Sequence, residues 1–221
     1  MKRIVTDAKK LSVRSDEIDV RKDGQLVQKI VLQLKEVVRA KNLTSLAAIQ
    51  IGYPKRIFVI NFNGDVRTFV NPIITNVKGF ELATETCASI PDKKYIRPRH
   101  NRVNVTYQTP LGKIESREFV GLAAIVFQHN VDHLDGLLLS DIGLEVGEDF
   151  YNASDEEKQE VISAYLDTLD IKQKEIQREV NENPELKQIS DAVEFMTGVA
   201  TGKVHLGEPI SLKKDAIAPV E

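Results

Sequence analysis

One stretch of the chain decides the fold, Val120-Gly-Leu-Ala-Ala-Ile-Val-Phe-Gln-His-Asn-Val-Asp-His-Leu134. It is apolar on nearly every side before its histidines, and Gly136 follows where a helix would end. The stretch therefore predicts a helix that runs through the middle of the fold. His129 and His133 stand four residues apart on it, so both imidazoles project from one face and can bind one metal ion.

This histidine pair by itself leaves two interpretations open. It fits a metal site, and it fits equally well two polar side chains at the border of a helix. In the zinc-hydrolase pattern His-Glu-x-x-His, the glutamate is the general base. Here the segment reads His129-Asn-Val-Asp-His133. The two candidate ligands are present and the base is not.

The sequence before this stretch predicts a helix followed by strands. Apolar residues recur every three or four positions between Gln25 and Val38, as on a helix with one buried face. Short β-branched runs then predict antiparallel strands at 56–61, 68–71 and 102–107. Their expected separators are the turn signals Asn63-Gly64, Asn71-Pro72 and Pro110-Leu-Gly112. We therefore expect an α+β fold, with antiparallel β-strands around a central metal-binding helix.

The composition changes after Gly147, which predicts two domains, residues 1–147 and an acidic helical C-terminal extension, residues 148–221. Ser154 and Glu157 match a capping box, with Val161, Tyr165 and Leu169 behind them at helical spacing. This pattern predicts an exposed amphipathic helix. We expect Pro184 to end or interrupt it and a shorter helix to follow from about Ser190 to Thr197.

Composition excludes several classes of protein. The 221 residues are 42% apolar and carry a formal charge of −3. No apolar run approaches the ~18 residues of a membrane span. The N-terminus has basic residues but no apolar region behind them, so we expect no secretory signal and a soluble, cytoplasmic protein. The chain lacks the clustered basic residues that would indicate direct DNA binding, so we expect none.

Cys87 is the only cysteine, so an intramolecular disulfide is excluded. It lies in Glu85-Thr-Cys-Ala-Ser-Ile-Pro91, after a strand-like region. A lone cysteine is usually a small buried apolar residue. A thiolate would also be a soft third ligand beside the two histidines.

At this point the chain resembles the peptide deformylase family of metal hydrolases, which remove the formyl group from the initiator methionine of new polypeptides. The family motifs are Gly-x-Gly-Leu-Ala-Ala-x-Gln, Glu-Gly-Cys-Leu-Ser and Gln-His-Glu-x-Asp-His-Leu. This chain has Leu43-Thr-Ser-Leu-Ala-Ala-Ile-Gln50, Glu85-Thr-Cys-Ala-Ser89 and Gln128-His-Asn-Val-Asp-His-Leu134, in the same order and with matching spacing. The resemblance covers roughly residues 1 to 145.

The resemblance implies that Cys87, His129 and His133 bind one divalent metal ion, Fe²⁺ or Zn²⁺. It implies that the Gln50 amide and the Ala88 backbone N–H donate to the oxygen of the attacked formyl group. The alanine keeps that donor but removes bulk from the methionine pocket. Arg99 is expected to pair with Glu85, and with Asp132, as structural support. The implied contacts with the peptide come from Leu43, Thr44, Ser45, Lys94 and Ile125.

The chain departs from the family at four motif positions. Asn130 replaces the glutamate that transfers the proton, and a carboxamide has no basic lone pair to accept one. Leu43, Ser45 and Thr86 replace glycines, and a β-carbon there restricts the backbone and fills space. Intact ligands beside altered catalytic positions indicate a fold or metal site that persisted while catalysis was relaxed.

Three hypotheses follow. The chain is a deformylase-like enzyme of impaired activity toward N-formyl-methionyl peptides, or a pseudoenzyme that keeps the metal site and binds a peptide or partner. The third is a fold relic without metal. Some bacterial members dock on the ribosome through a C-terminal helix, but the acidic character of 148–221 favours packing on the domain or on a second copy. A monomer and a homodimer both stay open.

Overall fold

The computed structural model describes residues 1–182, which fall into two compact units, one within residues 1–143 and one from residue 144 onward. Each unit is described by itself. The helices of the first unit are α1 (Ala8–Leu11), α2 (Gly24–Lys41), the 3₁₀ helix η1 (Ala48–Ile51), α3 (Leu122–Asp135) and α4 (Leu139–Ile142). Its strands are β1 (Ser45–Ala47), β2 (Ile57–Phe62), β3 (Asp65–Lys78), β4 (Glu81–Cys87), β5 (Ile90–Arg99), β6 (Arg102–Gln108) and β7 (Ile114–Val120).

Five strands of the first unit form one antiparallel sheet in the order β1-β2-β3-β6-β7. The turn Asn63-Gly64 joins β2 to β3, as its sequence predicts, and both residues have positive φ. Antiparallel strands with helices packed against them confirm the α+β fold class.

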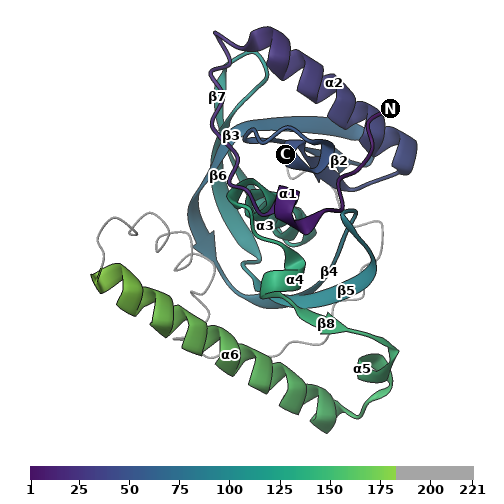
Figure 1. Cartoon of the computed structure of the whole chain (residues 1–221), viewed down its shortest axis with the longest axis vertical. Coiled ribbons are helices and arrows are strands. Elements are labelled where there is room, and N and C mark those ends of the chain that lie inside the picture. The colour runs from purple at the N-terminus through teal and green to yellow at the C-terminus, as the bar shows by residue number, and fades with distance from the viewer. Residues whose placement is uncertain (183–221) are drawn as a thin grey trace. The chain divides into compact units, whose positions relative to one another are not determined.

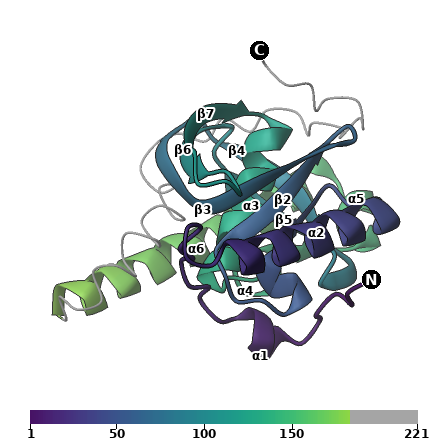
Figure 2. The ribbon, with the colours of Figure 1, turned by 90° about the horizontal axis from the view of Figure 1, so that it is seen from above.

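The sheet is covered on both faces. In β2, Ile57 and Val59 pack into a cluster with the buried face of α2, whereas Phe58 and Ile60 pack into a second cluster with α3. Because side chains alternate along a strand, the continuous apolar run of β2 serves both faces. Figures 1 and 2 show α2 lying along the sheet and α3 at the centre of the fold.

Aromatic rings hold α3 against the sheet. Phe127 is fully buried, with its ring centroid 5.0 Å from that of Phe58, 5.3 Å from Phe69 and 5.3 Å from Phe119. Burying one such ring contributes roughly 1.5–3 kcal/mol. The helix ends at Gly136, whose φ of 77° suits glycine, so both the predicted central helix and its predicted stop are confirmed.

One turn expectation is wrong. Asn71-Pro72 does not separate strands but lies inside β3, where Asn71 has a φ of 46° and the pairing with β6 shifts register. Proline cannot donate to a ladder and is tolerated at such a bulge. The expected strand at 68–71 is therefore the middle of a 14-residue strand.

Strands β4 and β5 form a separate antiparallel hairpin. The alternating inward positions of β4 are Ala83, Glu85 and Cys87, all buried. Period-two geometry therefore places a carboxylate and a thiol on one face of the hairpin.

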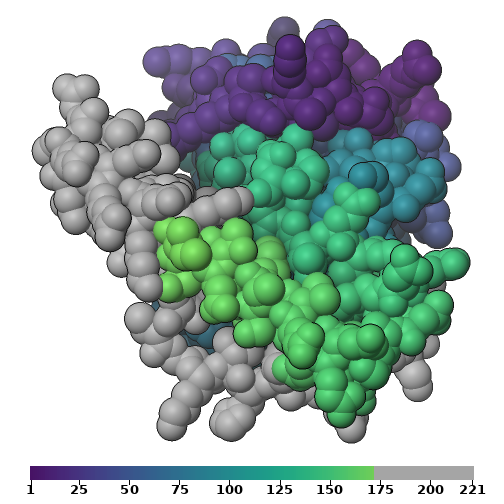
Figure 3. Space-filling view, turned by 60° about the horizontal axis from the view of Figure 1, so that its bottom comes forward, coloured from purple at the N-terminus to yellow at the C-terminus, as the bar shows by residue number. Residues whose placement is uncertain are grey.

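The N-terminal residues, purple in Figure 3, lie at the surface of the first unit. Helix α1 turns only Leu11 into the core. The Val5 N–H donates to the Gln50 carbonyl at 2.8 Å, which ties the N-terminal segment to η1.

The second unit contains β8 (Leu144–Val146), α5 (Glu148–Asn152) and α6 (Asp155–Glu182). The capping box at the start of α6 is confirmed, because the Ser154 N–H donates to Glu157 at 2.8 Å and the Glu157 N–H donates to Ser154 Oγ at 3.2 Å. Tyr165 and Leu169 are half-buried, whereas Val161 is 44% exposed. The expectations at Pro184 and at 190–197 lie outside the described residues. Among residues 1–182, no helix combines the length and apolar composition needed to cross a membrane.

Candidate metal centre

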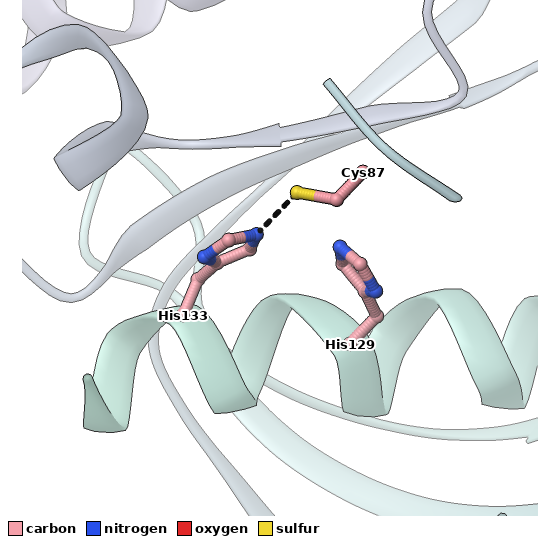
Figure 4. Close-up of side chains that lie close together, drawn as sticks. All are labelled: Cys87, His129 and His133. Carbon is pink, nitrogen blue, oxygen red and sulfur yellow. Dashed lines mark hydrogen bonds between the residues drawn. The ribbon is translucent and has the colours of Figure 1, made fainter. Parts of the chain in front are cut away.

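Three side chains that could ligate a metal converge between α3 and the end of β4. His129 and His133 rise from one face of α3, and Cys87 approaches them from β4 (Figure 4). Their ligand atoms all lie within 4.8 Å of one another, and Cys87 Sγ is 3.2 Å from His133 Nε2. The fold thus brings Cys87 into one cluster with two histidines that follow it by more than forty residues.

Glu85 fixes the orientation of His129. The carboxylate oxygen Oε2 lies 2.7 Å from His129 Nδ1, and Arg99 grips the same carboxylate through Nε at 2.6 Å and Nη2 at 2.9 Å. Burial raises the pKa of Glu85, but the charge of Arg99 and the bonds from His129 lower it more, so the pKa lies well below its usual value. An ionised carboxylate only accepts, so Nδ1 carries the proton and Nε2 is the nitrogen available to a cation.

The same cluster sets the protonation of the candidate ligands. Burial raises the pKa of the Cys87 thiol, but the hydrogen bonds from His129 and His133 outweigh it and lower that pKa to about 5. Burial lowers the pKa of His129, but the contacts with Cys87 and Glu85 raise it to about 9. Near pH 7 and without a metal, the centre therefore pairs a thiolate with an imidazolium.

Asp132 links a second arginine to this network. Arg99 Nη1 donates to Asp132 Oδ2 at 2.7 Å, so Arg99 contacts both Glu85 and Asp132. Arg97 Nη1 also donates to Asp132 Oδ2. All four side chains are almost completely buried. Buried charges are tolerated only when paired in this manner.

Gln50 lies on η1 with its amide beside the cluster. Its Oε1 accepts from the Ala47 N–H at 2.8 Å, which fixes the side chain from behind. Its Nε2 donates to Ser89 Oγ at 3.0 Å and lies 3.6 Å from Cys87 Sγ. The structure therefore brings a buried N–H donor next to the candidate ligands.

Asn130 is fully buried on α3 between the two histidines. Its Nδ2 donates to Ser45 Oγ at 2.8 Å and to the Val126 carbonyl at 2.7 Å. Because a carbonyl can only accept, these contacts assign the amide orientation. Both amide hydrogens are used, and the oxygen Oδ1 has no partner among the described residues.

A cavity of about 670 Å³ opens beside the cluster. It is lined by His129 and Glu85, by Leu122, Ile125 and Val126 of α3, by Leu43, Thr44 and Ser45 at β1, and by Gln50, Thr86 and Ala88. Of the residues expected to touch a peptide, Lys94 is the exception, since it is exposed on β5 and does not line the cavity.

Sequence reasoning missed Arg97, Ser89, Leu122 and Val126. A signal for Arg97 existed, because Arg97 and Arg99 are two apart on one strand and so share a face. Val126 and Leu122 likewise lie about one and two turns before His129 on the same side of α3. Nothing in the sequence marked Ser89 as a partner of Gln50.

The donor set fits a divalent transition metal. One thiolate and two imidazoles are ligands for which zinc and iron are suited, and ligands of a tetrahedral zinc ion lie ~3.5 Å apart. The separations of up to 4.8 Å need little change to reach this value. Glu85 supplies the carboxylate partner that metal-ligating histidines commonly have.

Comparison with known proteins gives one consistent result. A family model described as polypeptide deformylase matches residues 1–143. A peptide deformylase of Dictyoglomus turgidum is 33% identical over 126 residues, 57% of this chain and 82% of that protein. One from Pelagibacter ubique is 35% identical over 147 residues, 64% of this chain and 85% of that protein. The crystal structure of peptide deformylase from Thermotoga maritima superposes with a TM-score of 0.61 and 31% identity, covering 64% of this chain and 96% of that one.

Proposed function

Because the chain belongs to the polypeptide deformylase family, we propose that it hydrolyses the formyl group of N-formyl-methionyl peptides, and does so slowly. The observation that carries this proposal is the convergence of Cys87, His129 and His133 beside the cavity. In this proposal the three residues hold one Fe²⁺ or Zn²⁺ ion. Such an ion would polarise the formyl carbonyl and lower the pKa of the attacking water.

We place the peptide along β1. This strand is at the end of the sheet, and the carbonyl of Thr44, the residue before it, accepts from the Asn61 N–H of β2. Backbone groups alternate along a strand, so the N–H and C=O of Ser45 face away from β2, on the side of the cavity. An extended peptide can add to such an edge through its own backbone.

The apolar wall of the cavity suits the methionine side chain. Leu122, Ile125 and Val126 contribute this wall from α3, and Ala88 lies at the turn after Cys87. Burying an apolar side chain of this size contributes about 1.5–3 kcal/mol, which favours methionine over a polar residue.

Two donors are available for the oxygen of the formyl group, the Gln50 amide and the Ala88 N–H. Gln50 Nε2 has two hydrogens, one for Ser89 Oγ and one directed at Cys87 Sγ. The second is the one that would turn to the substrate. Donors fixed before the reaction contribute most where water is excluded, and Gln50 is buried.

The slow rate follows from Asn130. Its amide hydrogens are committed to Ser45 and Val126, and its oxygen can accept a hydrogen bond but no proton. The residue can therefore orient a water molecule without deprotonating it. General acid–base assistance contributes typically ~10²–10⁴ in rate, which this chain forgoes.

The direct test is formate release from formyl-Met-Ala-Ser by protein loaded anaerobically with Fe²⁺ or Zn²⁺. We expect slow release that disappears when Cys87 is replaced by alanine. Release that persists in the Cys87→Ala variant would refute the role of the cluster.

The same geometry supports a second candidate, a protein that binds formyl peptides without hydrolysing them. The observation in its favour is Asn130, whose amide donates to the Val126 carbonyl and cannot act as a base. Calorimetric titration with formyl-Met-Ala-Ser distinguishes the two. Saturable binding with no formate after many hours would favour the binding protein.

A further inference from the structure

Two buried carboxylates of the first unit share one arginine. Arg99 grips Glu85 through Nε and Nη2 and reaches Asp132 through Nη1 at 2.7 Å. The three side chains are between 3% and 12% exposed. A single guanidinium cannot neutralise two buried carboxylates. With these three residues alone, one negative charge would be left over.

Arg97 supplies the missing charge. It is 4% exposed, and its Nη1 donates to the same Asp132 oxygen that accepts from Arg99. Two arginines and two carboxylates then cancel. Asp132 is then paired with Arg97, and Arg99 Nε and Nη2 remain hydrogen-bonded to Glu85.

Glu85 in turn determines how His129 presents itself, because its Oε2 accepts from His129 Nδ1 at 2.7 Å. Contacts run without interruption from Arg97 through Asp132, Arg99 and Glu85 to this histidine. A partner that orients a metal-ligating histidine typically changes metal affinity by 10–100-fold when it is removed.

We infer that Arg97 is a positioning residue for the metal centre. As the counterion of Asp132, it leaves Arg99 hydrogen-bonded to Glu85, and Glu85 in turn holds His129 in the orientation that binds the metal. This inference rests on the proposed metal site. Without Arg97, Asp132 competes with Glu85 for the Arg99 guanidinium. Glu85 is then less firmly fixed, and it orients His129 less well.

The test measures how fast zinc leaves the full-length protein when the chelator 4-(2-pyridylazo)resorcinol is added in excess. For Arg97→Leu we expect release about 10-fold faster than from the wild type, at the low end of the range for such partners. Arg56→Leu is the matched control, because Arg56 pairs with Asp135 of the same helix at 2.6 Å without contacting the network. It should stay within about twofold of the wild type.

The double variant Arg97→Leu/Asp132→Asn tests whether the unpaired Asp132 carboxylate causes the faster release. It removes the competing carboxylate together with its counterion, so we expect release to return to within about threefold of the wild type. Because an uncompensated buried charge also lowers stability, urea unfolding is measured for both variants, and the faster release of Arg97→Leu must occur under conditions in which both variants remain folded. A double variant that is as fast as the single one overturns the inference.

The direction of the change is equally decisive. If Arg97 acted only as a positive charge near the cation, its removal would slow zinc release. Slower or unchanged release from Arg97→Leu therefore overturns the inference. If that variant does not fold, Arg97→Lys keeps the counterion and should stay within about threefold of the wild type, whereas tenfold faster release contradicts us. Wild-type protein that takes up less than about half an equivalent of zinc refutes the proposed site itself.

Discussion

At the scale of single residues, Asn130 is the position at which we propose that metal binding and proton transfer are separated. A carboxylate could not occupy its present contacts, because the Val126 carbonyl at 2.7 Å would face a second acceptor. The amide fits since it donates there and to Ser45. Asn130 and Ser45 therefore form one unit that joins α3 to the edge strand β1.

Restoring the carboxylate tests this interpretation. We expect Asn130→Glu to release formate from formyl-Met-Ala-Ser about 10²-fold faster than the wild type, because a base returns beside the centre. Asn130→Gln has the same length without the charge and should give no gain. The measurement is the initial rate of formate release at equal metal loading.

Equal rates for Asn130→Glu and the wild type would contradict the missing base as the main deficit. They would shift the obstruction to the side chains at Leu43, Ser45 and Thr86, all of which line the cavity. In that case Ser45→Gly combined with Asn130→Glu should recover the rate, because the glycine removes the hydroxyl that meets residue 130.

His129 gives a prediction about pH. Its pKa in the metal-free protein is raised to about 9, so near pH 7 it carries a proton on Nε2 that a metal must displace, whereas Cys87, with a pKa of about 5, is already a thiolate. Between pH 6 and 8 the apparent zinc affinity should therefore rise about tenfold per pH unit, with roughly one proton released per ion. Competition titrations against a chelator measure this slope. A flat profile contradicts the pairing of His129 with Glu85.

At the scale of elements, α3 contributes side chains both to the hydrophobic core and to the candidate metal centre. Phe127 packs against three other phenylalanines, while His129 follows it by two residues on another face. We expect Phe127→Ala to lower the free energy of unfolding by about 3–5 kcal/mol. Urea unfolding followed by circular dichroism measures the change.

Leu111 provides the control for this substitution, because it is 88% exposed. Leu111→Ala should change the unfolding free energy by less than about 0.5 kcal/mol. A loss for Phe127→Ala as small as that of the control would mean that α3 is not the centre of the core.

The elements differ in how far sequence could predict them. Helix α3 combines an apolar composition with a glycine stop, and sequence predicted it almost to the residue. The hairpin of β4 and β5 was not predicted, because the inward positions of β4 carry Glu85 and Cys87, and β5 contains the exposed charged run Asp92-Lys93-Lys94. Polar residues placed inward for a functional reason hide the alternation that marks a strand.

The candidate site divides in the same way. Cys87, His129 and His133 could be named in advance, since their types and spacing match a known motif. Arg97 was missed although it is two residues from Arg99, because arginines normally lie at the surface and the strand that puts both on one face was not predicted. Only the fold shows that its partner Asp132 is buried.

At the scale of the whole molecule, the unit within residues 1–143 is the part that matches known deformylases. About two thirds of this chain covers 96% of the Thermotoga maritima chain. All three candidate ligands, their partners and the cavity lie within these residues. The boundary of the extension at residue 147, expected from composition, stays a proposal.

Truncation tests whether the metal centre depends on the rest of the chain. Deleting residues 152–221 should leave the zinc content per protein unchanged, because no candidate ligand among the described residues lies beyond His133. Atomic absorption on full-length and shortened protein gives the comparison. Loss of metal from the shortened protein would show that the extension is needed to maintain the centre.

The most direct test of the central claim is X-ray absorption spectroscopy on the zinc-loaded protein. We predict about one zinc per chain, with one sulfur at ~2.3 Å and two imidazole nitrogens at ~2.0–2.1 Å. Replacing Cys87 by serine should remove the sulfur shell. A zinc ion without a sulfur neighbour, or binding well below one equivalent, would contradict a centre built from Cys87, His129 and His133.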